Sequence, residues 1–277
     1  MLDFTTRYHP LTSRPFLSDE SYREYPPCKA LRPYIACFWI SVEGRQETVK
    51  RSKEILIIPD TCMDVIIKIN HTRQTITGYL SALFDQPFIV EEKSHNDIIT
   101  TFAIRFHFWA AHLFLTLDFK EAHNHALELE VLGADWEELF RPFFYLDDIG
   151  QRIDRIESFL LKRLLMSELS SNLFNSIHQI ILTSGRSSVK EICEYCCVSQ
   201  RQLERIYSRD IGIPLKRMAN LVRYQNVWRE MVLTRNFDIH DAVYRFGYTD
   251  QAHLLKEFRR FHGTSPREAI EIAYANR

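Results

Sequence analysis

The sequence predicts an α+β protein of two domains, a β-rich N-terminal domain with trailing helices and an all-helical C-terminal domain. From about residue 33 to 108, apolar residues occur in short β-branched and aromatic runs separated by turn residues, the pattern of strands. After residue 108 the apolar period becomes that of amphipathic helices. Near the C-terminus, two stretches each read as a helix, a tight turn and a second helix with basic residues. We expect domains at 1–166 and 167–277.

The β-rich part is expected to form a small barrel or sandwich with a cupin-like arrangement of strands. Residues 1–30 contain several prolines and are expected to be irregular. Short runs with turn residues between them predict six strands. These are 34–42, 54–59, 64–69, 75–80, 87–92 and 98–108.

Helices are expected throughout the rest of the chain. Between the strands and the C-terminal domain they are predicted at 109–118, 135–146 and 147–169. In the last of these, the apolar stripe that includes Ile149 and Leu160 suits packing on the strands better than the alternative, a dimer contact. About seven helices are predicted in the C-terminal domain. These are 171–183, 188–197, 199–210, 214–233, 238–246, 249–262 and 266–274.

Composition excludes several classes of protein. The 277 residues carry a net charge of −1, but residues 167–277 hold 16 basic against 12 acidic side chains, an excess that suits contact with a polyanion. The six cysteines form no regular framework, which predicts reduced thiols. No signal-peptide pattern is visible, and the longest apolar stretch, 102–117, contains Arg105 and is too short to span a membrane. We therefore expect a cytoplasmic protein.

The helix predicted at 199–210 has one apolar and one basic face. Ser199 is a suitable N-cap, and Leu203, Ile206 and Tyr207 fall on the buried side. An arginine on the opposite side can bond guanine with two hydrogen bonds or clamp a phosphate. The outward residues are Arg201, Arg205 and Ser208, flanked by Glu204 and Arg209.

The helix predicted at 249–262 repeats this division. Leu254, Leu255, Phe258 and Phe261 form its apolar stripe. An outward alanine can contact a thymine methyl group, and an outward lysine can reach guanine or phosphate. The outward residues are Ala252, His253, Lys256 and Arg260, flanked by Arg259.

These two units resemble the AraC/XylS family of bacterial transcription regulators over roughly 185–270. The resemblance lies in "VSQRQLERIYSRDIGIPLKRMANLVRY" and "DIHDAVYRFGYTDQAHLLKEFRRFHGTSP". It implies a sequence-specific regulator that binds double-stranded DNA, is not an enzyme and needs no cofactor. Cys197 departs from the family pattern because a turn glycine is usual there. By this resemblance the base-reading positions are Arg201, Glu204 and Arg205, with Gln251, Ala252 and Lys256.

The N-terminal part is similar to the sensor domain of one AraC-type subgroup, through "LRPYIACFWI", "IIPDTCMDVII" and "FAIRFHFWAAHLFL". This implies a sensor domain without implying a ligand. We separately expect a small-molecule effector of undefined identity. A homodimer and, if the protein is an activator, RNA polymerase are further expected partners. We expect an interior pocket lined by Trp39, Tyr79 and Arg105 and closed on one side by helices from 109–166.

Arg105 lies in an apolar strand, where a charge needs a partner. Asp60 and Asp64 are plausible partners in a structural ion pair. The alternative is that Arg105 anchors an anionic effector.

Two other classes of function are weighed and ranked lower. A DNA-repair methyl-acceptor protein needs four zinc-binding cysteines in its N-terminal domain, and only three are present there. A cupin-type metalloprotein needs a cluster of metal ligands, for which His107, His123 and His125 are the candidates. Cys193, Cys196 and Cys197 are expected to be structural thiols on the buried face of one helix, without a metal.

Overall fold

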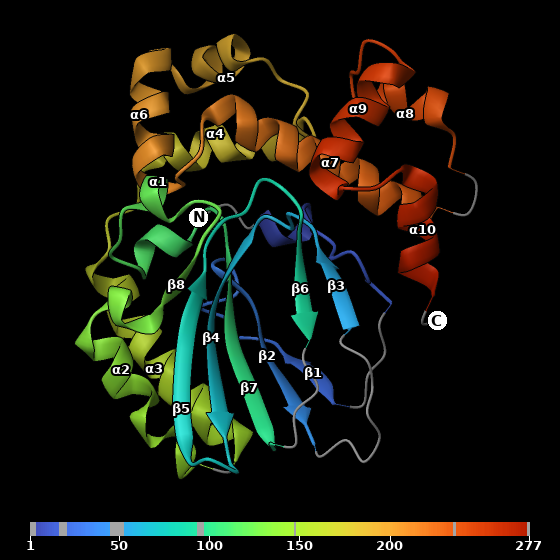
Figure 1. The fold of residues 1–277 in the computed structure, drawn as a ribbon. Coiled ribbons are helices and arrows are strands. Elements are labelled where there is room, and N and C mark those ends of the chain that lie inside the picture. The colour runs from blue at the N-terminus through green and yellow to red at the C-terminus, as the bar shows by residue number, and fades with distance from the viewer. Residues whose placement is uncertain are drawn as a thin grey trace.

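The fold consists of a layered β domain and a helical domain that lies across one end of it (Figure 1). The computed structural model describes residues 4–16, 21–44, 53–92, 97–146, 148–234 and 237–275. The six predicted strands and the seven predicted C-terminal helices all form, with ends within two residues of the expected ranges. The two periodicities of the sequence therefore identify the elements correctly.

Six strands form one antiparallel sheet in the order β1-β2-β7-β4-β5-β8. Its long central strands carry the apolar runs of the sequence, and alternate side chains point to opposite faces. The strands of this sheet are β1 (Tyr22–Tyr25), β2 (Ile35–Glu43), β4 (Cys62–Asn70), β5 (Thr75–Ser81), β7 (Ile99–His107) and β8 (Ala126–Glu128).

The other two strands, β3 (Lys53–Ile57) and β6 (Phe88–Glu92), pair only with each other. They lie in front of the large sheet, beside β7 and β2 in the view of Figure 1. The described strands thus make an open, two-sheet arrangement. Of the two expected forms, the sandwich describes it and the closed barrel does not.

Helices cover the face of the large sheet that points away from β3 and β6. They are α2 (Ala134–Phe140), the 3-10 helix η4 (Arg141–Phe144) and α3 (Ile149–Met166). Phe143 meets Phe102 of β7 edge-to-face, with ring centroids 5.7 Å apart. Ile156 and Leu160 of the predicted apolar stripe are fully buried. The stripe of α3 therefore packs within the N-terminal domain, as expected.

Some short elements depart from the prediction. The proline-rich N-terminal segment was expected to be irregular, yet it contains η1 (Phe4–Thr6) and the edge strand β1. The helix expected at 109–118 is reduced to the 3-10 turn η2 (Ala111–Leu113), followed by α1 (Phe119–Ala122), β8 and η3 (Leu129–Leu132). Elements of three or four residues are too short to show a period in the sequence.

The helical domain is arranged around α7 (Leu215–Leu233), most of whose side chains are buried. Two helix pairs lie at the two ends of α7 (Figure 1). The other helices are α4 (Ser171–Leu182), α5 (Val189–Cys196), α6 (Gln200–Asp210), α8 (Ile239–Arg245), α9 (Gln251–His262) and α10 (Pro266–Tyr274). Among the described helices, none combines the length and apolar character needed to cross a bilayer.

Polar contacts fasten α7 to the N-terminal domain. The Gln225 side chain forms two hydrogen bonds with the backbone of Leu11. Its Oε1 accepts from the Leu11 N–H at 2.8 Å, and its Nε2 donates to the Leu11 carbonyl at 3.2 Å and to the Pro59 carbonyl at 2.6 Å. The Trp228 indole donates to the Thr12 carbonyl at 3.0 Å. These bonds satisfy polar groups that the interface removes from water, so the two domains are held in one relative position.

Candidate nucleic-acid interface and ligand cavity

The first helix-turn-helix unit consists of α5, a tight turn and α6. Ser188 caps α5 and forms a reciprocal capping box with Glu191. The turn passes through Cys197, whose φ of 54° lies in the left-handed region. The Val198 N–H then donates to the Cys193 carbonyl at 3.2 Å. A positive φ favours glycine, which is the residue usual at this turn in the family that the sequence resembles.

The second unit, α8 and α9, follows the same path 50 residues later. Its turn passes through Gly247 at a φ of 66°. The Tyr248 N–H donates to the Val243 carbonyl at 2.9 Å, the counterpart of the bond from Val198 in the first unit. Asp250 then caps α9 through the His253 N–H at 2.7 Å. The two units are therefore repeats of one structural motif.

The predicted faces of α6 are confirmed. Leu203, Ile206 and Tyr207 are buried, and the Tyr207 hydroxyl hydrogen-bonds Ser176 of α4 at 3.0 Å. On the outside, Arg201 and Arg205 are exposed, and neither forms an ion pair with a described residue. Their guanidinium groups are therefore available to a partner.

The faces of α9 are also as predicted. Leu254, Phe258 and Phe261 are buried, while Leu255 is half-buried. Its outward side chains are exposed, apart from the half-buried His253. The exposed ones are Gln251, Ala252, Lys256, Arg259 and Arg260.

Three of the predicted contact residues already bond within the chain. Glu204 accepts from the Leu215 N–H at 3.3 Å, which supports the start of α7. Arg209 pairs with the carboxylate of Asp210 at 2.6 and 2.7 Å. His253 bonds the Thr249 hydroxyl at 2.8 Å.

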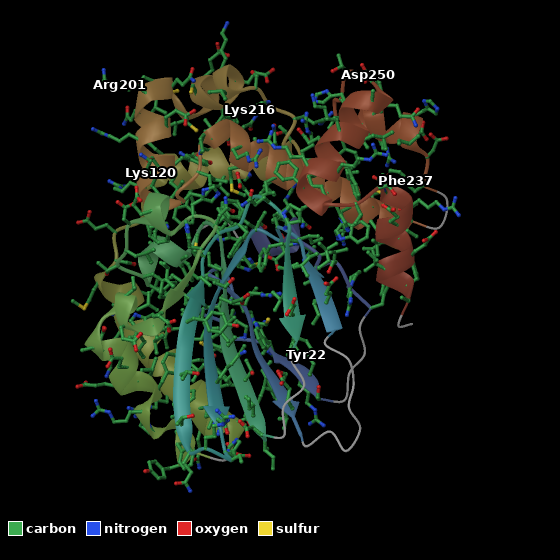
Figure 2. The ribbon with its side chains drawn as sticks, in the orientation of Figure 1. Tyr22, Lys120, Arg201, Lys216, Phe237 and Asp250 are labelled. Carbon is green, nitrogen blue, oxygen red and sulfur yellow. The ribbon has the colours of Figure 1, made fainter. Side chains whose placement is uncertain are left out.

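The N-terminal ends of α6 and α9 point away from the sheets. Figure 2 shows Arg201 and Asp250 at the side of the helical domain farthest from the β domain. The opposite ends of both helices rest on the N-terminal domain. An added Cβ at Gly212, just after α6, would lie 2.2 Å from the Phe119 carbonyl oxygen, and Gly263, just after α9, packs beside Pro87. In helix-turn-helix proteins the N-terminal part of the second helix contacts bases, so these free ends are suitably placed.

A buried ion pair supports the second unit, and the sequence analysis did not find it. Arg223 of α7 donates two hydrogen bonds to Glu257 Oε1, at 3.0 and 2.8 Å, and one to Oε2 at 2.8 Å. Tyr248 adds a bond from its hydroxyl at 2.8 Å, and its ring lies 4.1 Å from the guanidinium carbon. A glutamate inside an amphipathic helix was the only available sign of this contact.

A cavity of about 460 Å³ lies between the two sheets. The three predicted lining residues, Trp39, Tyr79 and Arg105, all border it. Its other wall is formed by β3 and β6, and the helices of 109–166 cover the opposite face of the large sheet. The expectation that those helices close the pocket is therefore wrong. Both faces of the sheet are apolar, so the alternation of side chains alone did not show which face the helices cover.

Arg105 is paired inside this cavity with both predicted partners. Its Nε and Nη2 each donate to an Asp64 carboxylate oxygen at 3.0 Å, and Nη2 lies 3.5 Å from Asp60 Oδ2. Burial raises the pKa of the Asp60 carboxyl, although the Arg105 guanidinium opposes this effect. The prediction of an ion pair is thus confirmed.

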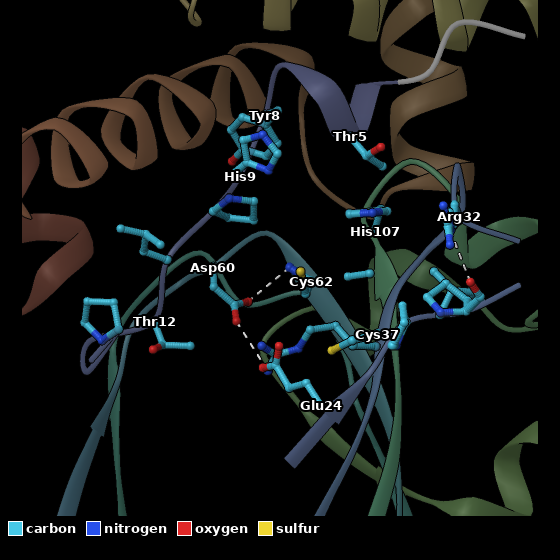
Figure 3. A pocket seen from close by; sticks show the side chains of 18 residues that line it. Thr5, Tyr8, His9, Thr12, Glu24, Arg32, Cys37, Asp60, Cys62 and His107 are labelled. Carbon is cyan, nitrogen blue, oxygen red and sulfur yellow. Dashed lines mark hydrogen bonds and ion pairs between the residues drawn. The ribbon is translucent and has the colours of Figure 1, made fainter. Parts of the chain in front are cut away.

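A second cavity of about 530 Å³ lies on the other side of Asp60 (Figure 3). Asp60, Cys62 and Arg105 border both cavities. In Figure 3, Tyr8, His9 and Thr12 approach from the N-terminal segment, the same segment that is bonded to α7. The Asp60 region therefore lies between the ligand cavity and the contacts with the helical domain.

The candidate metal ligands do not converge. Within the described ranges, no group of three or more His, Cys, Asp or Glu side chains is placed to hold a metal ion. His123 instead contacts Asp85 at 3.1 Å, and His107 stacks on Trp109. All six cysteines are described and free; Cys196 is buried as expected, but Cys197 is exposed at its turn.

Comparison with known proteins assigns both parts of the chain to families. Residues 192–271 match a family described as a helix-turn-helix domain, and residues 23–128 match a domain of unknown function, DUF6597. No curated protein matches the chain.

Solved structures of ToxT from Vibrio cholerae are distantly similar. ToxT of strain O395 is 12% identical with a TM-score of 0.43, and the match covers 92% of this chain and 99% of ToxT. For wild-type ToxT of strain SCE256 with bound unsaturated fatty acid, the values are 14%, 0.43, 86% and 96%.

The family match agrees with the two repeated units and with the spacing of their sequence motifs. Residues 192–271 of this chain therefore form an AraC-type helix-turn-helix domain.

Proposed function

We propose that this protein regulates transcription by reading double-stranded DNA with α6 and α9. The supporting observation is that the N-terminal ends of both helices lie on the side of the molecule away from the sheets, and that these helices carry exposed basic side chains (Figure 2). The base-reading side chains that we propose are Arg201, Arg205, Gln251, Ala252 and Lys256.

The flanking residues have positioning and phosphate-binding roles in this proposal. Arg259 and Arg260 extend the basic surface of α9 toward the DNA backbone, where positive charge increases affinity without selecting sequence. On α6, the guanidinium of Arg209 and the hydroxyl of Ser208 are proposed to bond phosphate. Glu204 and His253 contribute mainly by holding α7 and the start of α9 in place.

Selection of duplexes from a random pool by the full chain tests this function. We expect an enriched site with two sequence blocks, one for each recognition helix, and an affinity that falls steeply with salt as counterions are released. Recovery of only one block would mean that a single unit docks. The absence of any salt-sensitive enrichment would contradict the proposal.

We further propose that the N-terminal domain binds a small-molecule effector in the cavity between the sheets. An apolar cavity with a few fixed polar groups is the usual form of such a site. The domain division is proposed at residue 167, between α3, which packs on α2, and α4, which packs on α5 and α6. A ligand can alter DNA binding only by the difference between its affinities for two states of the protein.

A further inference from the structure

We propose that the cavity between the sheets binds an organic monocation, a small molecule with an apolar body and one amine or quaternary ammonium group. This inference rests on the proposed ligand-binding role of the cavity and specifies its ligand class. Three features support it, namely the balance of charges, the aromatic walls and the pairing of Arg105 with Asp64.

Among the described residues, the charged groups that line the cavity are two carboxylates and one guanidinium. Both carboxylate oxygens of Asp64 accept hydrogen bonds from Arg105, each at 3.0 Å. The Asp60 carboxylate lies farther from the same guanidinium, at 3.5 Å. One negative charge is therefore incompletely neutralised in a largely apolar space. A charge in that position is unfavourable unless it is paired, so a cation that enters beside Asp60 would relieve the imbalance.

Two neighbouring rows of side chains form the floor of the cavity. In one row, the pairing of the strands places Trp39 and Tyr79 on the outer strands, with Ala103 and Ile66 between them. The next row places Arg105 beside Asp64. Aromatic rings therefore flank the small and aliphatic centre of the floor, one step along the strands from the carboxylates.

The opposite wall adds apolar surface. Ile55 pairs with Val90 and Ile57 with Phe88 in the β3–β6 ladder, and all four border the cavity. Ile57 is 36% and Val90 42% exposed, so this wall is accessible from solvent. The cavity thus offers an apolar wall for the body of a ligand and aromatic faces with a carboxylate for its cationic head.

The ring of Tyr79 already has a cation over one of its faces. The Lys68 ammonium, which does not border the cavity, lies 5.7 Å from the ring centroid. An anionic ligand would meet the opposite situation. The Nε and Nη2 of Arg105 both donate to Asp64, and an anion would lie beside two carboxylates. The structure therefore disfavours Arg105 as an anchor for an anionic effector.

Calorimetric titration of the full chain with three small probes tests the ligand class. The probes are phenyltrimethylammonium, its neutral isostere tert-butylbenzene, and phenylacetate as the anion. We expect the cation to bind about tenfold more tightly than the neutral isostere, since it adds the carboxylate and cation–π attraction to the same shape. Phenylacetate should bind more weakly than either.

Asp60→Asn identifies the carboxylate responsible. Asparagine keeps the acceptor that receives the Cys62 N–H at 3.0 Å and leaves the Arg105–Asp64 pair intact. It should lower the affinity for the cation about tenfold and leave tert-butylbenzene unchanged. Asp118→Asn is the matched control, because it makes the same change at an exposed helix cap and should alter neither affinity. Tyr79→Leu is a second variant that keeps both carboxylates and should also weaken the cation selectively.

Several results would overturn the inference. These are no binding of phenyltrimethylammonium, binding of phenylacetate or tert-butylbenzene at least as tight, or an unchanged cation affinity in both Asp60→Asn and Tyr79→Leu. DNA binding of the same preparation is measured separately. Protein that retains DNA but binds no cation contradicts this inference alone. Protein that binds the cation but no duplex contradicts the proposed regulatory function instead.

Discussion

The first helix-turn-helix unit, α5 with α6, and the second, α8 with α9, share one backbone path but are held in place by different contacts. Beneath α9, Arg223 and Glu257 form a buried ion pair with several hydrogen bonds. Beneath α6, the neutral pair Tyr207 and Ser176 is buried instead, and Glu204 supports the start of α7 from a half-buried position. The turns also differ, with Cys197 in the first unit and Gly247 in the second.

This difference indicates two ways to fix a recognition helix. The first unit depends on apolar packing and caps, whose contributions are individually small. The second unit depends mainly on one buried ion pair, in which the loss of either partner leaves the other charge unpaired. The second unit should therefore be more sensitive to single substitutions in its support, and the first more tolerant.

The largest effect is expected from Glu257→Gln. The variant leaves the Arg223 guanidinium buried without a carboxylate, which should reduce the free energy of unfolding by about 3–5 kcal/mol. Urea unfolding followed by circular dichroism measures the change. Glu271→Gln, in an exposed pair with Arg267, is the control and should cost less than about 1 kcal/mol. Similar losses in the two variants would show that burial does not make the Arg223–Glu257 pair more important than an exposed ion pair.

Smaller losses, in DNA affinity rather than stability, are expected from Arg205→Ala and Lys256→Ala. If both helices read bases, each variant should weaken binding to the selected site by about 1–3 kcal/mol and relax one sequence block only. Arg205→Ala should affect the block read by α6, and Lys256→Ala the block read by α9. Arg267→Ala on α10 is the control. An equal loss on all sequences would assign the side chain to phosphate contact instead.

The junction between α7 and the N-terminal domain should show a dependence on pH. Burial alone would raise the pKa of Asp85, but hydrogen bonds from His123, Arg217 and Asn124 outweigh it, and the pKa lies well below its usual value. The stabilisation is therefore complete above the unfolded pKa of about 4 and is lost as the pH falls toward the folded pKa.

Asp85→Asn should remove this contribution, with a loss of about 1.5 kcal/mol at neutral pH. Unfolding of wild type and variant from pH 7 down to pH 3 is the measurement. The difference between them should be constant above about pH 5 and shrink below about pH 4. A difference that stays constant to pH 3 would show that the carboxylate charge is not what stabilises the junction.

The smallest effect concerns the two turns. Cys197 adopts a left-handed conformation that costs a residue with a Cβ about 1 kcal/mol, so Cys197→Gly should raise stability by about that amount. Gly247→Cys should lower it by a similar amount, since the nearest atom to an added Cβ there is 3.5 Å away and only the backbone conformation opposes the change. Thermal denaturation of both variants checks this. A stabilising Gly247→Cys would refute the equivalence of the turns.

The sequence was sufficient to predict the features that depend on residues close together in the chain. The strands, the helices, their caps and the outward faces of α6 and α9 follow from period and capping chemistry. Contacts between distant segments did not follow. The pairing of β3 with β6 as a separate sheet, the wall of the cavity and the Arg223–Glu257 pair all join residues far apart in the chain. Their sequence patterns are compatible with several partners, and only the folded arrangement selects one.

If α6 and α9 read DNA as proposed, the close approach of Gly212 to Phe119 affects which operator spacings the protein accepts. Both recognition helices end against the N-terminal domain, so the distance and rotational phase between their free ends are set jointly by α7 and by that domain. Two helices that enter successive major-groove segments must match a helical repeat of about 10 base pairs. We therefore expect the full chain to discriminate sharply between operators whose two blocks are separated by spacers differing by a single base pair. The N-terminal domain would then help to determine the length of spacer that the protein accepts.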